Sequence, residues 1–321
     1  MKKLFQNVVG QEGAISILSA QIESENLSHA YIFSGKEGMG KDFLARQFAK
    51  YILCENREDD ECENCTRFEK GVHPDFIYVD GTNGIKIETA REVIKRINLS
   101  PSLSKYKVLL LSGAENLGLE AANAMLKTFE EPPADSVIIM TATSEKSLPE
   151  TIVSRGQKIK LKEIPAEDLK KIFSKDALKE NLGKIISYSE GSIGEVKKMI
   201  EDSDYLLKKE KLAEKVEKIL LSGSVIEKFK ILEDANKDKY IKELLSLFMF
   251  VSVGALKKKL SGEDVEFFSE ICEKTANHYQ TEDLVKIIQK TLKIYENLGY
   301  NVNLKLALEE IVLEGQASFT E

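Results

Sequence analysis

The segment SGKEGMGKD at residues 34–42 has the glycine and lysine spacing of a phosphate-binding loop. Gly35, Gly40 and Lys41 satisfy G-x-x-x-x-G-K, in which backbone amides surround the phosphates and the lysine neutralises their charge. The next position holds Asp42, where a working loop has a Ser or Thr whose hydroxyl ligates Mg²⁺. Asp42 places negative charge beside the phosphates, so we expect no hydrolysis.

The segments around this loop favour phosphate binding, because an apolar run precedes it and a helical pattern follows it. A turn that needs glycines only for its backbone geometry is the alternative interpretation. Catalysis also needs acidic side chains after a second apolar strand, but KVLLL runs into Ser112 and Gly113, and the first acid is Glu115. The sequence therefore predicts a degenerate loop that requires no cofactor and leaves weak ATP or ADP binding open. Its candidate residues are Gly35, Gly38, Gly40, Lys41 and Asp42.

Three of the four cysteines, Cys54, Cys62 and Cys65, follow one another in a C-x₇-C-x₂-C pattern. Such a cluster indicates metal binding rather than a secreted disulfide scaffold. Zinc needs a fourth ligand, and a metal-free remnant is therefore the alternative. Nearby ligand types are Asp59, Asp60, Glu61, Glu69 and His73, of which His73 lies in an HPD segment that we expect to serve packing or turn formation.

Composition limits the class of protein. A chain of 321 residues with 42% hydrophobic and 31% charged residues is typical of a largely helical globular protein of two or three domains. A net charge of −7 argues against a protein that coats DNA by itself. Apolar stretches fall short of the ~20 residues of a membrane span, so we expect a cytoplasmic protein without a membrane partner.

Short apolar runs alternate with helical patterns from residue 28 to about 160, which predicts an α/β domain with a mostly parallel sheet covered on both faces. After Ile164 and Pro165 the remaining chain reads as helices. We expect an α/β domain at 1–164 that carries the cysteine cluster, a small helical domain at 165–208 and a helical domain at 209–321. Cys272 is expected to be a buried helix residue.

Five segments occur in the order found in the clamp-loader subunits of bacterial DNA polymerase III. The chain resembles the delta-prime type of these subunits. The five segments are VVGQE, HAYIFSGKEGMGK, HPDFIYVD, AANAMLKTFEEPP and LPETIVSRG. The resemblance covers residues 5 to about 160 strongly, and NVNLKLALEEIVL is similar to the end of the family's last domain. It implies an AAA+ module, a helical lid and a collar that joins subunits in a five-membered ring.

The sequence departs from the ATPase members of that family at three positions. Those members have Thr after the loop lysine, Asp-Glu after the second strand and an Arg in the lid, whereas this chain has Asp42, Ser112-Gly113 and Gly194. The resemblance therefore implies a structural subunit without catalytic activity of its own, within a DNA polymerase holoenzyme. Its implied partners are the tau/gamma ATPase subunits and delta, with the sliding clamp and primed DNA contacted through the complex.

The resemblance also assigns roles to Arg155 and Phe68. Arg155 in SRG matches an arginine finger that acts in the ATP site of the neighbouring subunit, although Gly156 replaces the family's Cys. An arginine paired with a local carboxylate is the alternative. Phe68 stands where the family has the fourth zinc-binding Cys, so we expect substoichiometric or absent zinc at Cys54, Cys62 and Cys65.

Two other functions compete with a structural clamp-loader subunit. An active AAA+ loader ATPase of the tau/gamma type is disfavoured by the missing Thr and acidic pair, and a zinc-knuckle nucleic-acid-binding protein by the charge and the missing ligand. In the segment before EEPP, Ala122, Met125 and Phe129, together with Leu126, lie at core spacing. Asn123 and Lys127, which lie off this stripe, are interaction candidates.

Overall fold

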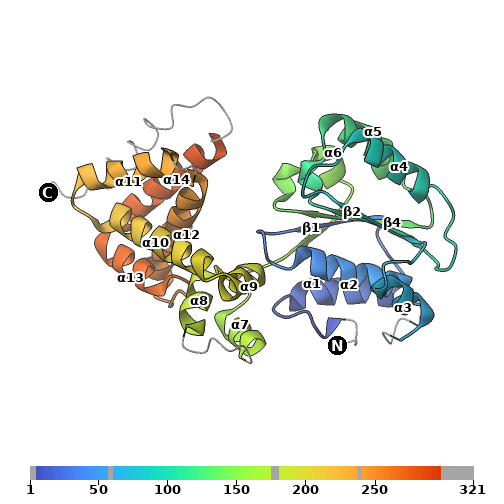
Figure 1. The fold of residues 1–321 in the computed structure, drawn as a ribbon, viewed down its shortest axis with the longest axis horizontal. Coiled ribbons are helices and arrows are strands. Elements are labelled where there is room, and N and C mark those ends of the chain that lie inside the picture. Colours follow the sequence, from blue (N-terminus) through green and yellow to red (C-terminus); the bar gives the residue numbers. More distant parts are fainter. Residues whose placement is uncertain (1–4, 57–60, 175–180, 238–239, 298–321) are drawn as a thin grey trace. The chain divides into compact units, whose positions relative to one another are not determined.

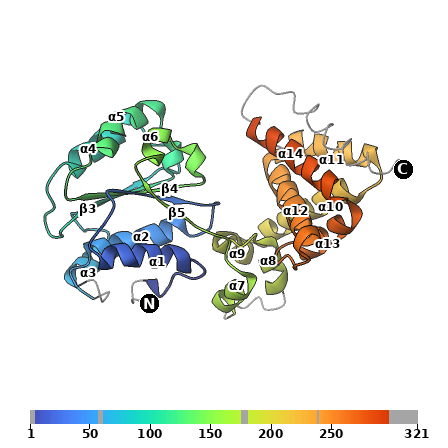
Figure 2. The same cartoon turned by 180° about the vertical axis from the view of Figure 1, so that it is seen from behind.

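The computed structural model describes residues 5–56, 61–174, 181–237 and 240–297 (Figures 1 and 2). Its contacts divide the chain into two compact units. Unit 1 contains Met1–Asp168 together with Ser192–Gly194, and unit 2 contains Leu169–Gly191 and Glu195–Glu321. Within the described ranges, no helix is long and apolar enough to cross a membrane.

Unit 1 is built on a five-stranded sheet in the order β2-β3-β4-β1-β5, and every neighbouring pair is parallel. The strands are β1 (Ala30–Ser34), β2 (Phe76–Asp80), β3 (Lys107–Ser112), β4 (Ser136–Ala142) and β5 (Gln157–Lys160). The first four are the apolar runs of the sequence, which confirms the predicted parallel sheet. Strand β5 has a single buried side chain, Ile159, and its polar neighbours explain why no apolar run indicated it.

Helices cover both faces of this sheet, as Figure 1 shows. One face packs against α1 (Glu12–Glu23), α2 (Lys41–Leu53) and α3 (Glu63–Glu69), and the other against α4 (Ile87–Ile97), α5 (Leu119–Glu130) and α6 (Glu150–Val153). Side chains alternate between the two faces along each strand. Tyr31 and Phe33 thus join the first core, where Tyr31 packs edge-on against Phe48, while Ile32 joins the second.

Helix α5 has the predicted amphipathic pattern. Ala122, Met125 and Phe129 are buried, Leu126 is half-buried against the same core, and Asn123 and Lys127 are exposed. Because one face carries the apolar contacts, the polar residues on the other are available to a partner. The helix ends at Glu130, just before the two prolines.

The rest of the described chain is helical, as predicted. It contains α7 (Ala166–Phe173), α8 (Leu182–Tyr188), α9 (Ile193–Glu201), α10 (Ser203–Leu221), α11 (Val225–Lys237), α12 (Ile241–Ser261), α13 (Ser269–His278) and α14 (Thr281–Asn297). The boundary predicted at 208 falls inside α10, and the division into lid and collar stays a prediction. Cys272 is fully buried in α13, as expected. The segment NVNLKLALEEIVL lies outside the described residues.

The HPD segment fixes the loop that leads into β3. Asp75 is fully buried, and its carboxylate accepts backbone N–H groups of Ser102 (2.7 Å), Leu103 (2.7 Å) and Ser104 (2.9 Å). The Nδ1 atom of His73 accepts the N–H of Asp75 at 3.2 Å. His73 therefore serves the turn, as expected from the sequence.

Charge strengthens this arrangement. Burial alone would raise the pKa of the Asp75 carboxyl, but the amides of Leu103, Ser104 and Ser102 and the nearby Lys107 ammonium lower it below its usual range. Lys107 Nζ lies 3.9 Å from the carboxylate. The ionised form is thus the one that the fold stabilises.

Asp75→Asn should lower the free energy of unfolding by about 2–4 kcal/mol at pH 7, because an amide cannot accept all three N–H groups with a full charge. Since the folded pKa lies below the unfolded one, the charge-dependent stabilisation is fully present above about pH 4 and is lost as the pH falls through the folded pKa. Urea unfolding at pH 7 and pH 3 measures both effects. Asp80→Asn, at an exposed carboxylate that accepts hydrogen bonds from the N–H and the hydroxyl of Thr82, is the control and should change stability far less. Equal unfolding midpoints for the two variants would refute this role.

Candidate functional site

The glycine-rich loop joins β1 to α2, where a phosphate-binding loop requires it. Gly38 and Gly40 have φ angles of 77° and 83°, in the left-handed region that favours glycine. These two glycines are therefore required by the backbone itself. The structure thus supports the interpretation that the glycines serve the backbone geometry of the turn. This role is the same whether or not the loop binds phosphate.

Lys41 is turned onto its own loop. Its Nζ donates to the carbonyl oxygens of Gly35 (2.7 Å) and Lys36 (2.8 Å). Burial lowers the pKa of the Lys41 ammonium, while the negative charge of Glu115, followed by Asp42 and Glu37, opposes this effect. To contact a phosphate, the ammonium must give up these two carbonyl contacts.

Asp42 joins the start of α2 to the carboxyl ends of two strands. Its Oδ2 accepts a hydrogen bond from Ser112 Oγ at the end of β3 (2.5 Å), and its Oδ1 accepts one from Thr141 Oγ1 in β4 (2.7 Å). Thr141 Oγ1 in turn accepts the N–H of Gly113 at 3.1 Å. The structure therefore brings together two positions that the sequence identified separately, 42 and 112, and adds Thr141, which no motif had indicated.

Glu115 is the acidic residue nearest to the loop lysine on the β3 side. Its Oε1 accepts the N–H of Thr143 at 2.9 Å, and its Oε2 is buried without a hydrogen-bond partner among the described residues. The carboxylate raises the proton affinity of Lys41 through its charge. An acid is thus present near the loop, but it does not stand at the end of the strand where a metal-binding acid is needed.

Residues 192–194, which belong to unit 1, close against the loop. The N–H of Gly194 donates to the carbonyl of Gly38 at 3.0 Å, and Ser192 Oγ donates to the carbonyl of Glu37 at 3.4 Å. A Cβ atom at position 194 would lie 2.7 Å from the Cα of Gly38. Glycine at 194 therefore permits a backbone contact that any side chain, including the family's Arg, would prevent.

The three clustered cysteines lie together, with their sulfur atoms within 4.8 Å of one another. The Sγ atoms of Cys54 and Cys62 are 3.8 Å apart, and Cys62 Sγ accepts the N–H of Cys65 at 3.4 Å. Burial raises the pKa of the Cys65 thiol. The cluster has the donor atoms of a soft-metal site, but a buried thiol must first lose its proton.

The fourth ligand is missing from the part of the chain that the structure describes. Phe68 packs against Phe76 with ring centroids 4.5 Å apart, and no further Cys, His, Asp or Glu joins the described cluster. Glu69 pairs with Lys50 at 2.5 Å, and His73 contacts Ser104. Asp59 and Asp60 lie outside the described residues. The three sulfurs therefore do not complete the tetrahedral shell that a structural zinc ion requires.

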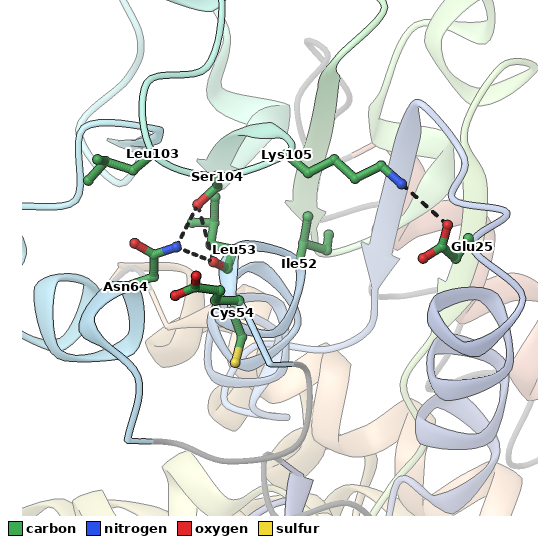
Figure 3. A pocket seen from close by; sticks show the side chains of 9 residues that line it. Glu25, Ile52, Leu53, Cys54, Asn64, Leu103, Ser104 and Lys105 are labelled. Atoms are coloured by element: carbon green, nitrogen blue, oxygen red, sulfur yellow. Dashed lines mark hydrogen bonds and ion pairs between the residues drawn. The ribbon is translucent and has the colours of Figure 1, made fainter.

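A hollow of about 380 Å³ lies beside this cluster and is shown in Figure 3. Its polar groups already bond to one another: Asn64 donates to the carbonyl of Leu53 and to Ser104, and Lys105 pairs with Glu25 at 3.3 Å. The Cys54 sulfur points away from Asn64 and Ser104 (Figure 3). Because no glycine of the loop lines this hollow, it is not part of the nucleotide site.

Arg155 follows α6, and its side chain is 44% exposed. Its Nη1 donates to the carbonyl of Thr151 at 2.9 Å, and its Nη2 lies 3.6 Å from Oε1 of Glu130. The guanidinium thus has a local carboxylate neighbour and also faces solvent, so the geometry accommodates both interpretations of the sequence. At Gly156 a Cβ would lie 2.6 Å from the end of the Ile32 side chain, which fills the space of the family's Cys.

Comparison with known proteins relates the chain to subunits of one polymerase. The family described as DNA polymerase III, delta subunit, matches residues 10–165. The tau/gamma subunit of Haemophilus influenzae is 35% identical over 184 residues, which cover 56% of this chain and 27% of that protein. The gamma subunit of Buchnera aphidicola (subsp. Schizaphis graminum) is 34% identical over 215 residues, covering 64% and 59%.

A fourth comparison extends along nearly the whole chain. The delta' subunit of DNA polymerase III from Bacillus subtilis is 24% identical over 316 residues, which cover 94% of this chain and 95% of that protein. The chain thus spans less than two thirds of the tau and gamma relatives just described, but almost all of this delta' relative.

Zinc should be absent or substoichiometric in the purified protein, because Phe68 cannot supply the fourth ligand. Elemental analysis before and after dialysis against a chelator measures the zinc content per chain. Phe68→Cys is the matched test of the geometry, and this variant should retain close to one zinc ion per chain. One tightly held zinc ion in the unaltered chain would overturn the prediction and point to a carboxylate or histidine ligand.

Proposed function

We propose that the chain is the non-hydrolysing, delta-prime-type member of the DNA polymerase III clamp loader, because the family model matches residues 10–165 and a delta' subunit matches 94% of the chain. In this role it completes the ring with the tau/gamma ATPase subunits and delta, and contributes to loading the sliding clamp onto primed DNA. It has no catalytic activity of its own, and it works in the cytoplasm, where DNA replication takes place in bacteria. Its charge of −7 fits contacts with DNA that are made through the complex.

The observation that carries this proposal is the position of the Asp42 carboxylate. In a working loop, a hydroxyl at this position and an acid at the end of the neighbouring strand hold Mg²⁺ against the phosphates. Here Asp42 bonds directly to Ser112 and Thr141, and Lys41 bonds to loop carbonyls. The hydroxyl and the acid that hold Mg²⁺ in a working loop therefore do not stand at their usual positions.

The nearest competing function is an ATPase subunit of the tau/gamma type, because those relatives are 35% and 34% identical over 56% and 64% of this chain, whereas the delta' relative is 24% identical. The near full-length match to a delta' subunit and the altered residues 42, 112 and 194 favour the structural role. A zinc-knuckle nucleic-acid-binding protein is a weaker candidate, because the cysteine cluster lacks a described fourth ligand.

Arg155 is the residue through which this subunit acts on its neighbour in our proposal. Its partial exposure leaves guanidinium donors free to reach outward, and its bond to Thr151 holds the side chain near the end of α6. A guanidinium placed in trans stabilises the charge that develops as the γ-phosphoryl group leaves. The pair with Glu130 is a surface contact and opposes this use only weakly.

The isolated protein should hydrolyse no ATP above background. Asp42 replaces the hydroxyl that holds Mg²⁺, and Ser112 and Gly113 replace the acidic pair that holds Mg²⁺ and the attacking water. A coupled phosphate-release assay with Lys41→Ala as the control measures this. Turnover that disappears in Lys41→Ala would show an active site and would favour the ATPase alternative. Calorimetry with ADP separately measures any weak binding.

Arg155→Ala should leave the ring assembled while the clamp-stimulated ATP turnover of the complex falls, because the guanidinium acts on the transition state rather than on assembly. A finger supplied in trans contributes on the order of 10³-fold or more at its own site, of which a ring with several sites shows only part. Arg155→Lys should restore little, since an ammonium lacks the planar fork of donors. The assay is steady-state ATPase of the reconstituted complex with primed DNA and clamp.

The control for this assay is Arg67→Ala, which removes a comparably exposed arginine that also pairs with a carboxylate, Glu63. Native mass spectrometry of each complex measures assembly independently of turnover. If Arg155→Ala and Arg67→Ala behave alike, or if Arg155→Ala prevents assembly, Arg155 is a structural residue. If the unaltered chain enters no complex with tau/gamma and delta, the proposed function itself fails.

A further inference from the structure

We propose that the Asp42 carboxylate does permanently what a bound Mg²⁺ ion does transiently in a working loop, which is to join the first turn of α2 to the ends of β3 and β4. Asp42 and Ser112 form, in this view, an exchanged pair, in which the carboxylate and the hydroxyl of the metal site have changed places. The inference deepens the proposed non-hydrolysing role at the same site, and it is tested on the isolated chain.

The exchange follows from the positions of the two side chains. A working site takes its hydroxyl from the residue after the loop lysine and its carboxylate from the end of the neighbouring strand. In this chain the residue after Lys41 is Asp42, and the last residue of β3 is Ser112. The two chemical groups of the metal site are thus both present, each at the other's position, and they bond to each other.

Distance argues against an ion between them. Mg²⁺ binds oxygen ligands at about 2.0–2.1 Å in octahedral geometry, so adjacent ligand atoms lie roughly 3 Å apart. Asp42 Oδ2 and Ser112 Oγ are instead joined by a direct hydrogen bond of 2.5 Å that Ser112 donates. An ion could bridge them only after this hydrogen bond had broken and the two atoms had separated.

The surrounding groups complete the connection without an ion. Thr141 Oγ1 donates to the second carboxylate oxygen of Asp42 and accepts the N–H of Gly113. The carboxylate therefore has a hydroxyl donor on each oxygen, one from each of two adjacent strands. Its charge also lies in the first turn of α2, where a helix favours an anion. The joint between helix and sheet is thus independent of metal and nucleotide.

A double-mutant cycle tests the exchange. Asp42→Thr removes the carboxylate, and Ser112→Asp places a second carboxylate against the first, so each single variant should raise the unfolding equilibrium constant roughly tenfold or more. Asp42→Thr with Ser112→Asp restores one carboxylate and one hydroxyl, and most of the loss should be recovered. Urea unfolding of the isolated chain in a chelator measures all four proteins.

The control is Glu88→Thr, which makes an equivalent change at the second residue of another helix in the same unit, α4. It accounts for the loss of an acidic residue from a first turn and should have a much smaller effect. If Ser112→Asp does not fold, Asp42→Asn replaces it in the comparison, because it keeps one acceptor oxygen and should fall between Asp42→Thr and the unaltered chain. An Asp42→Thr variant as stable as Glu88→Thr would overturn the proposal.

The second readout is the response to Mg²⁺ alone. The unaltered chain should keep its unfolding midpoint when millimolar Mg²⁺ replaces the chelator, whereas the double variant should gain stability. Stabilisation of the unaltered chain by Mg²⁺, or a double variant no more stable than Asp42→Thr in either buffer, would refute the exchange. These outcomes do not involve ring assembly or Arg155, so they are distinct from a failure of the proposed function.

Discussion

The parallel direction of all five strands is the constraint on which the arrangement of unit 1 depends. Parallel strands place their carboxyl ends at one edge of the sheet, and the segments that leave this edge must meet there. The glycine-rich loop leaves β1, Ser112 ends β3, and Thr141 lies near the end of β4. Residues about 70 and 100 positions apart in the sequence therefore become neighbours of Asp42. Crowding at this edge also explains Gly81, where a Cβ would lie 2.3 Å from the carbonyl of Ser112.

Local pattern was sufficient to predict most of the fold. Four strands are continuous apolar runs, and α5 has a complete helical stripe, so burial on two faces or on one can be read directly from the sequence. Strand β5 was not predicted because it contributes only one buried side chain, Ile159, and pairs with β1 through its backbone. The contact between Gly194 and Gly38 was not predicted for a similar reason, since backbone hydrogen bonds between distant residues leave no periodic pattern in the sequence.

At the site, the sequence likewise identified residues by their type but did not identify the residues with which they bond. The sequence identified Asp42, Ser112 and Gly194 as departures from a catalytic pattern, and all three lie around the loop. It did not indicate what replaces the lost contacts, because Thr141 and the loop carbonyls belong to no motif. Arg155 is the opposite case. Its type and neighbours in the sequence indicate a role, whereas among the described residues its guanidinium contacts Thr151 and Glu130, and the group on which the proposed finger would act is not part of this chain.

The direct bond between Asp42 and Ser112 has a consequence for the history of this chain. A return to a metal-binding loop needs two substitutions, and either one alone gives two carboxylates in contact or two hydroxyls without a charge. Under the proposed exchange, both intermediates would be less stable than this chain, and a marginally stable fold has little stability to lose. Natural selection acts on single changes as they arise, so the first substitution toward a metal-binding loop would be opposed by its own cost in stability. The proposed exchange would thus act as an evolutionary ratchet, since restoring the metal site requires both substitutions together.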